Sequence, residues 1–335
     1  MSNRYLKQEL FLGKDSRLKL QNAHAIIIGL GALGSSISEM LVRAGIGHIT
    51  LVDRDYVEWS NLQRQVLYTE DDAKNKLPKA IAAKNRLSQI NSEINITSHV
   101  SDINGLNIEE LIKDQSVIID ATDNFETRMI INDAAVKHGI PFIYGACVAS
   151  YGLTFPIIPG KTPCLHCLIN HLPTQGMTCD TVGVISPIVQ IIASFQVTHV
   201  LKLLTGTELL PILHSIDVWK NENIEINVDR LKNENCPTCG NHATFPYLTV
   251  ENQTKTDILC GRDAIQLRSG ASRTISLETL AESLKGLADD LIINPYLISF
   301  TFEENRIVLF KDGRAIIHGT NDPTRARAIY DKILG

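Results

Sequence analysis

Four cysteines occur as two pairs with the spacing that suits a metal ion. Cys164 and Cys167 form one C-x-x-C pair, and Cys236 and Cys239 form the other, far downstream. Each pair can fill two corners of a tetrahedral zinc site, and four thiolates leave no position open for a substrate. The sequence therefore predicts a structural Zn²⁺ centre that ties two distant segments of the chain together.

A glycine-rich segment predicts a site for phosphate. Gly29, Gly31 and Gly34 follow a short β-branched run and precede an amphipathic helical pattern. Glycines at this junction allow a tight turn, and the start of the following helix offers unpaired N–H groups to an anion. Asp53 lies about 20 residues further on, where a carboxylate can bind a ribose hydroxyl. These features alone fit NAD as well as ATP.

Charged residues beyond the glycines favour ATP. Arg64 and Lys79 can neutralise a polyphosphate, and Asp123, at the end of a strand, can hold Mg²⁺ through oxygen. Hydride transfer to or from NAD would need none of these groups. The alternative is that Arg64 and Lys79 are solvated surface charges, which is the usual fate of a single cation.

The elements around these residues alternate between strands and helices. Such an alternation predicts an α/β fold, a Rossmann-like, doubly wound and mostly parallel sheet with helices on both faces. We expect it to fill a first domain, residues 1–245, together with the zinc centre. The expected strands are residues 24–29, 48–52, 116–119 and 141–145, and the expected helices are 32–43, 78–89 and 125–138.

The pattern changes in the last part of the chain. Residues 246–335 read as a small α+β extension, with several strand candidates and a Lys-Asp-Gly turn between a first and a last helix. The expected helices are residues 277–287 and 323–334, and the expected strands are 297–303, 306–310 and 315–318.

Composition narrows the class of protein. The chain has 335 residues, 44% of them hydrophobic, and a formal net charge of -5, so no global basic field favours nucleic acid as a partner. Residues 1–14 lack the apolar core of a secretory signal, and polar residues interrupt the apolar run at 182–204, which predicts a buried helix and no membrane span. Seven cysteines, an odd number, fit a reducing compartment, and we expect the cytoplasm.

Together these motifs resemble the ThiF/MoeB family, the bacterial relatives of ubiquitin-activating enzymes. The resemblance covers about residues 2–245 and rests on the glycine segment 29–34, the segments 51–55, 61–65 and 121–124, and the paired cysteines. It implies that ATP adenylates the C-terminal glycine of a ubiquitin-like sulfur-carrier protein and releases pyrophosphate, for thiamine or for molybdopterin synthesis. It also implies a homodimer.

The resemblance also implies roles for individual residues. Its catalytic set is Arg64, Lys79, Asp123 and Cys179, and its nucleotide-binding set adds Gly29, Gly31, Gly34, Asp53, Asp55, Asn61, Asn124 and Lys7. Within these sets Asp53 would bind the ribose and Asp123 would serve Mg²⁺. Lys7 stands where the family usually has an arginine that reaches the ATP of the partner subunit, so it would act in trans without the planar fork that grips phosphate.

Some alternatives stay open at this level. Cys179 is either a nucleophile that bonds to the activated carrier or a dispensable thiol, because adenylation itself needs no cysteine. Cys260 opens the C-terminal extension, for which carrier docking or structural packing is favoured over sulfur transfer. The competing functions for the whole chain are a Rossmann oxidoreductase and a zinc-ordered binding scaffold without catalysis.

Overall fold

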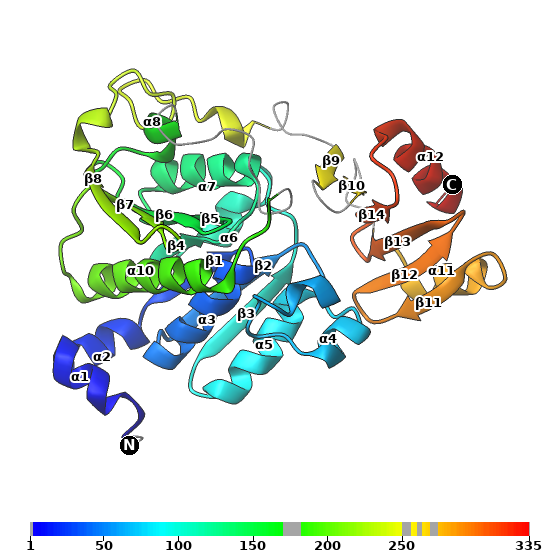
Figure 1. The fold of residues 1–335 in the computed structure, drawn as a ribbon, viewed down its shortest axis with the longest axis horizontal. Helices are drawn as coiled ribbons and strands as arrows, with labels where there is room; N and C mark the ends of the chain where they lie inside the picture. Colours follow the sequence, from blue (N-terminus) through cyan, green and yellow to red (C-terminus); the bar gives the residue numbers. More distant parts are fainter. Residues whose placement is uncertain (1–2, 170–181, 250–255, 260–262, 269–273, 335) are drawn as a thin grey trace. The chain divides into compact units, whose positions relative to one another are not determined.

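The structure is a computed structural model that describes residues 3–169, 182–249, 256–259, 263–268 and 274–334. The chain divides into two compact units, Met1–Gln253 and Thr254–Gly335 (Figure 1). The change of pattern along the sequence predicts a domain boundary between residues 245 and 246. The first unit continues beyond it because the backbone N–H of Tyr247 donates to the Asp133 carboxylate, 2.8 Å away.

An eight-stranded sheet forms the centre of the first unit, in the order β3-β2-β1-β4-β5-β6-β7-β8. The pairs β3–β2, β2–β1, β1–β4 and β4–β5 are parallel. The pairs β5–β6, β6–β7 and β7–β8 are antiparallel. The strands are β1 His24–Ile28, β2 His48–Asp53, β3 Asn95–Val100, β4 Val117–Asp120, β5 Phe142–Val148, β6 Tyr151–Ile157, β7 Ile212–Asp217 and β8 Glu222–Asn227.

Helices cover both faces of this sheet, and the predicted α/β class is confirmed. Successive residues of a strand point to opposite faces, so Ile27 joins a core with α3, α5 and α10, while Ile26 and Ile28 join a core with α6 and α7. The helices are α1 Leu6–Leu12, α2 Lys14–Gln21, α3 Ala32–Ala44, α4 Glu70–Lys74, α5 Lys79–Ile90, α6 Ile108–Ile112, α7 Phe125–His138, α8 Leu165–Leu168 and α10 Ser186–Thr205.

The strand order reverses between β1 and β4, which are neighbours in the sheet. At such a point the chain leaves the two strands toward opposite faces, and a crevice opens at their carboxyl ends. The glycine segment follows β1, Asp53 ends β2, and residues 121–124 follow β4. The fold therefore brings the predicted nucleotide-binding segments to one edge of the sheet.

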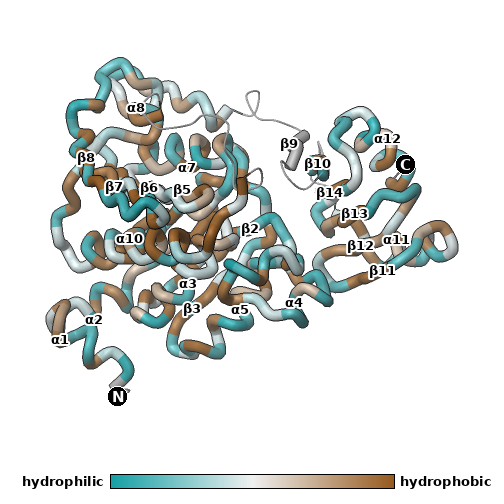
Figure 2. Tube along the Cα trace, in the orientation of Figure 1, coloured by the Kyte–Doolittle hydropathy of each residue, from teal (hydrophilic) through white to brown (hydrophobic). Residues whose placement is uncertain are grey.

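Helix α10 is the apolar run noted in the sequence, and Figure 2 shows its hydrophobic residues. By length and composition it could cross a membrane, and 44% of its most apolar window is buried inside the protein. It packs against α3 and against strands β5 and β6. This packing is that of a core helix, as the polar interruptions predicted.

A buried histidine in α10 makes the stability of the fold depend on pH. His199 is 5% exposed, and burial, with the neighbouring His214 and Lys202 as lesser causes, lowers its pKa to about 4. The unfolded chain binds this proton near pH 6.5, so the stabilisation is complete above pH 6.5 and is lost as the pH falls toward 4. We expect a loss of about 3 kcal/mol from this group. Calorimetry at pH 7 and pH 4.5 should show a smaller drop in Tm for His199→Gln than for the unaltered chain, and equal drops would contradict the assignment.

The second unit is an antiparallel sheet of six strands in the order β11-β12-β13-β14-β10-β9. It has its own hydrophobic core, to which α11 and α12 contribute, for example through Leu280 and Ile329. The α+β class predicted for the C-terminal extension agrees with this arrangement. The elements are β9 Thr256–Leu259, β10 Ala264–Leu267, α11 Leu277–Leu284, β11 Asp289–Ile293, β12 Leu297–Phe302, β13 Asn305–Phe310, β14 Ala315–His318 and α12 Pro323–Leu334.

Candidate functional site

The glycine segment is a tight loop pressed against the end of β4. Gly29 has φ 89°, and a Cβ there would lie 2.5 Å from the carbonyl oxygen of Ala121. A Cβ on Gly34 would lie 1.9 Å from the carbonyl oxygen of Gly29. Gly31 differs, because the nearest atom to a Cβ there is the Gln65 amide nitrogen at 3.8 Å. Two of the glycines thus close the turn, and a Cβ on the third would meet no backbone atom within 4 Å.

Asp53 fixes the loop to the end of β2. One carboxylate oxygen accepts the N–H of Leu30 and the other accepts the N–H of Asp55, each at 2.6 Å. Burial raises the pKa of Asp53, and the cation of Lys79 opposes that shift. A carboxylate offers about four lone-pair positions, so a ribose hydroxyl can still bind to Asp53.

Lys79 is buried behind the loop, and its position is set by two partners. Its ammonium group lies 3.3 Å from a carboxylate oxygen of Asp55, and its side chain is 4% exposed. The Tyr68 hydroxyl donates to the carbonyl of Leu30 at 2.7 Å and reaches the carbonyl of Lys79 at 3.5 Å. The structure therefore joins Asp53, Asp55 and Lys79 in one cluster, and the reading of Lys79 as a solvated surface charge fails.

Arg64 and Asn61 lie on the segment after β2. Asn61 is buried and ends the short 3₁₀ helix Trp59–Asn61, where its side-chain oxygen accepts the N–H of Glu58 at 3.0 Å. Arg64 is half-buried and donates to the carbonyl of Ser60 at 2.8 Å. Among the described residues Arg64 forms no ion pair, so its positive charge is available to a phosphate.

Gln65 is a candidate that the sequence reading passed over. It is 3% exposed, and its amide nitrogen would lie 3.8 Å from a Cβ built on Gly31. Its buried amide oxygen has no hydrogen-bond partner among the described residues. A buried amide oxygen without a partner is costly, which makes it a natural contact for a bound ligand. Its place in the segment 61–65 was the signal that could have identified it.

Of the polar side chains at the end of β4 and in the loop that follows it, some stabilise the fold and one is exposed. Asp120 is fully buried, and its carboxylate binds the Arg128 guanidinium at 3.2 Å. Asn124 caps α7 by accepting the N–H of Thr127 at 2.8 Å. Asp123, between them, is exposed. The geometry thus leaves Asp123 as the carboxylate of this loop that a solvent-borne Mg²⁺ can reach.

Lys7 lies at the opposite edge of the sheet from these groups. Its helix, α1, is held by Gln8, which donates to the carbonyl of Ala44, and by Tyr5, whose hydroxyl accepts from Asn91 at 2.7 Å. Ala44 and Asn91 lie just before β2 and β3, at the amino ends of the strands. Lys7 is exposed there and is remote from the glycine loop of its own chain.

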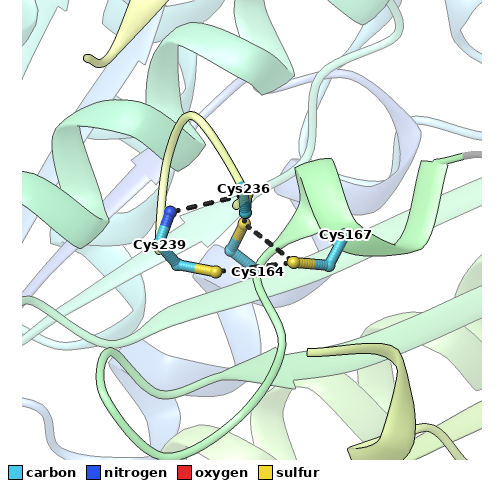
Figure 3. Close-up of side chains that lie close together, drawn as sticks. All are labelled: Cys164, Cys167, Cys236 and Cys239. Carbon is cyan, nitrogen blue, oxygen red and sulfur yellow. Dashed lines mark hydrogen bonds between the residues drawn. The ribbon is translucent and has the colours of Figure 1, made fainter. Parts of the chain in front are cut away.

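The four cysteines converge, as Figure 3 shows. Their sulfur atoms all lie within 4.8 Å of one another, with Cys164 to Cys236 at 3.6 Å and Cys167 to Cys239 at 3.4 Å. Four thiolates at 2.3 Å from a tetrahedral zinc ion would be about 3.8 Å apart. The Cys167 sulfur beside it raises the pKa of Cys164. Positive charge at the centre would favour four ionised sulfurs, so the donor set fits a zinc-type ion.

Cys179, the remaining predicted catalytic residue, lies outside the described residues, as does Cys260.

Comparison with known proteins agrees with this arrangement. The model of the ThiF family matches residues 3–238. The sulfur carrier protein ThiS adenylyltransferase of Bacillus subtilis is 57% identical over 337 residues, 100% of both chains. The protein of the same name from Escherichia coli is 32% identical, over 72% of this chain and 97% of its own.

A solved structure with the same fold is also known. The crystal structure of Escherichia coli MccB with ATP superposes with a TM-score of 0.62 and 25% identity, over 72% of this chain and 75% of that chain. The family match covers far more than half of the chain, and the named relatives are adenylyltransferases. The chain is therefore an adenylyltransferase and belongs to the ThiF family.

Proposed function

We propose that this enzyme uses ATP to adenylate the C-terminal glycine of a ubiquitin-like sulfur-carrier protein, in the synthesis of the thiamine thiazole. The observation that carries the proposal is the 57% identity, over the whole of both chains, with a ThiS adenylyltransferase. The relative named adenylyltransferase and sulfurtransferase MOCS3-1, from Drosophila pseudoobscura pseudoobscura, matches over only 53% of its own length, at 32% identity. These likenesses favour the thiamine carrier over the molybdopterin carrier, and we propose that the reaction takes place in the cytoplasm.

The chemistry requires positive charge and positioning. A carboxylate oxygen of the carrier bonds to the α-phosphorus of ATP, and the bond from that phosphorus to the bridging oxygen of pyrophosphate breaks. Both partners are anions, so cations must screen their approach and the departing pyrophosphate. Arg64 and Lys79 carry that charge, and Asp53 holds the loop and the ribose. No general base is needed, because the attacking carboxylate is already ionised at neutral pH.

A bound metal ion would complete this charge balance. Mg²⁺ held at this site would supply positive charge to offset that of the phosphates. The exposed carboxylate of Asp123 suits that hard cation, which prefers oxygen ligands. The four cysteines would hold Zn²⁺ in a closed, structural site that takes no part in the reaction.

The proposal includes a homodimer. Helix α1 buries none of its residues and exposes Leu10 by 73% and Phe11 by 88%. Apolar residues exposed in this way favour a protein interface. Since Lys7 is remote from the glycine loop of its own chain, it can reach a nucleotide only on a second copy. Sedimentation at 37.1 kDa, the mass of one chain, would contradict this part of the proposal.

Pyrophosphate exchange tests the function directly. Purified enzyme, ATP, Mg²⁺ and labelled pyrophosphate are combined with a thiamine-type or a molybdopterin-type carrier. Each carrier is supplied with its Gly-Gly end intact and with that end removed. We expect exchange only with the intact thiamine-type carrier. Exchange with the molybdopterin-type carrier alone would reassign the pathway, and no exchange with either would overturn the proposed substrate.

A further inference from the structure

A carboxylate in the middle of α7 is buried away from the nucleotide loop. Asp133 is 0% exposed, and both of its oxygens are used. One accepts the hydroxyl of Thr238 at 2.6 Å, and the other accepts the backbone N–H of Tyr247 at 2.8 Å. Both partners lie more than 100 positions further along the chain, so this single carboxylate binds a segment that is distant in sequence to α7.

Thr238 lies between two of the metal-ligating cysteines. It is fully buried, and its backbone N–H donates to the Cys236 sulfur at 3.4 Å. The N–H of Cys239 approaches the same sulfur at 3.5 Å. N–H groups directed at a sulfur fix its position relative to the backbone, and hydrogen bonds of this kind orient metal ligands. The hydroxyl bond to Asp133 therefore orients the peptide group that serves a ligand atom.

The preceding residue of α7 holds the other cysteine pair. Asn132 is also 0% exposed, and its side-chain oxygen accepts the N–H of Leu165 at 2.8 Å. Leu165 lies between Cys164 and Cys167. Two consecutive side chains of one helix thus bind two segments that are 72 positions apart in sequence, one on each side of the metal centre.

The segment of Cys236 and Cys239 has no regular structure to fix it. Residues 232–245 are turns and irregular backbone, with no helix or strand. Bringing such a segment into a tetrahedral arrangement costs conformational entropy, unless other bonds have already fixed it. Groups that orient metal ligands through hydrogen bonds contribute to metal affinity for this reason.

From these contacts we propose that Asp133, through the Thr238 hydroxyl, is a positioning residue of the metal centre. It holds the Cys236 segment in the ligating geometry and so raises the affinity for Zn²⁺. The inference rests on the zinc assignment made under the proposed function. It is independent of the carrier and of ATP.

Zinc transfer from the purified holo-protein to a chromophoric chelator measures this affinity without nucleotide or carrier. Thr238→Val removes the hydroxyl and keeps the shape of the side chain, whereas Thr238→Ser keeps the hydroxyl. Thr154→Val is the matched control, because Thr154 is also fully buried and its hydroxyl donates to the carbonyl of Tyr144 at 2.9 Å, away from the cysteines. Asp133→Asn tests the carboxylate itself.

We expect Thr238→Val to bind Zn²⁺ about 10-fold to 100-fold more weakly, and Asp133→Asn to weaken it in the same direction. Thr238→Ser should restore the affinity. Thr154→Val should lower the Tm without changing the affinity. The proposal is overturned if Thr238→Val and Thr154→Val retain zinc equally well, or if the unaltered protein carries no zinc. Adenylation of the carrier can succeed or fail without bearing on either result.

Discussion

Replacing Cys236 and Cys239 together by serine should strongly destabilise the first unit of the chain. Structural zinc contributes its binding free energy to folding, about 10 to 16 kcal/mol in small zinc domains. This unit also has two hydrophobic cores of its own, so we expect a smaller loss, about 5 kcal/mol or more. For a unit of this size that loss lowers the Tm by roughly 10 to 20 °C, which calorimetry can measure directly.

Two controls separate the metal from the substitution. Prolonged exposure of the unaltered protein to a strong chelator should reproduce the loss, and Zn²⁺ should reverse it. Cys147→Ser changes a half-buried cysteine outside the cluster and should leave the zinc content intact. If the double variant had the same Tm as the unaltered protein, the four sulfurs would not hold a structural ion.

The second large effect should come from a single methyl group in the glycine loop. In Gly34→Ala the new Cβ would lie 1.9 Å from a backbone oxygen and 2.8 Å from the carbonyl carbon of Gly29. Neither atom belongs to a flexible side chain, so β1 and α3 must move apart. Overpacking typically costs 1 to 3 kcal/mol, and a clash with backbone should cost about 3 kcal/mol or more. Denaturant unfolding of the purified variant would measure the loss, and poor soluble yield would be its extreme form.

Gly31→Ala is the matched variant, with the opposite expectation. Its Cβ would meet only the Gln65 amide nitrogen, 3.8 Å away, which is an ordinary van der Waals contact. The fold should therefore persist, with a change in unfolding free energy within about 1 kcal/mol. The methyl group would occupy the space proposed for phosphate, so ATP affinity measured by calorimetry should fall at least about 10-fold. If Gly31→Ala bound ATP normally, the nucleotide would have to lie elsewhere.

Sequence patterns predicted the parallel half of the sheet better than the antiparallel half. Strand β1 and helix α3 were expected at residues 24–29 and 32–43 and lie at His24–Ile28 and Ala32–Ala44. Their apolar residues repeat with the period of the element, and the glycines mark the turn between them. Strand β8 gave no such signal, because all six of its residues are exposed and mix glutamate and asparagine with isoleucine. Its pairing depends on β7, which no local pattern reveals.

The site could be predicted only in part, for a similar reason. Sequence motifs identified Asp53, Lys79 and the four cysteines as candidates, because the residue types and their spacing along the chain suit nucleotide and metal binding. The partners of these residues depend on the assembled fold. The bond from Asp53 to the N–H of Leu30 joins two strand ends, and Gln65 became a candidate only when its buried amide proved to face Gly31. The roles given to the predicted site residues, Asp123 and Cys179 among them, stay predictions.

The separate hydrophobic core of the second unit has a practical consequence for measuring any of these variants. Its members, such as Phe300 and Ile317, are not shared with the cores around the eight-stranded sheet. A melting curve of the whole chain should therefore contain two cooperative events, and a single fitted midpoint would misrepresent both. The substituted residues all lie in Met1–Gln253, so the unfolding event that belongs to Thr254–Gly335 serves as an internal reference within the same sample.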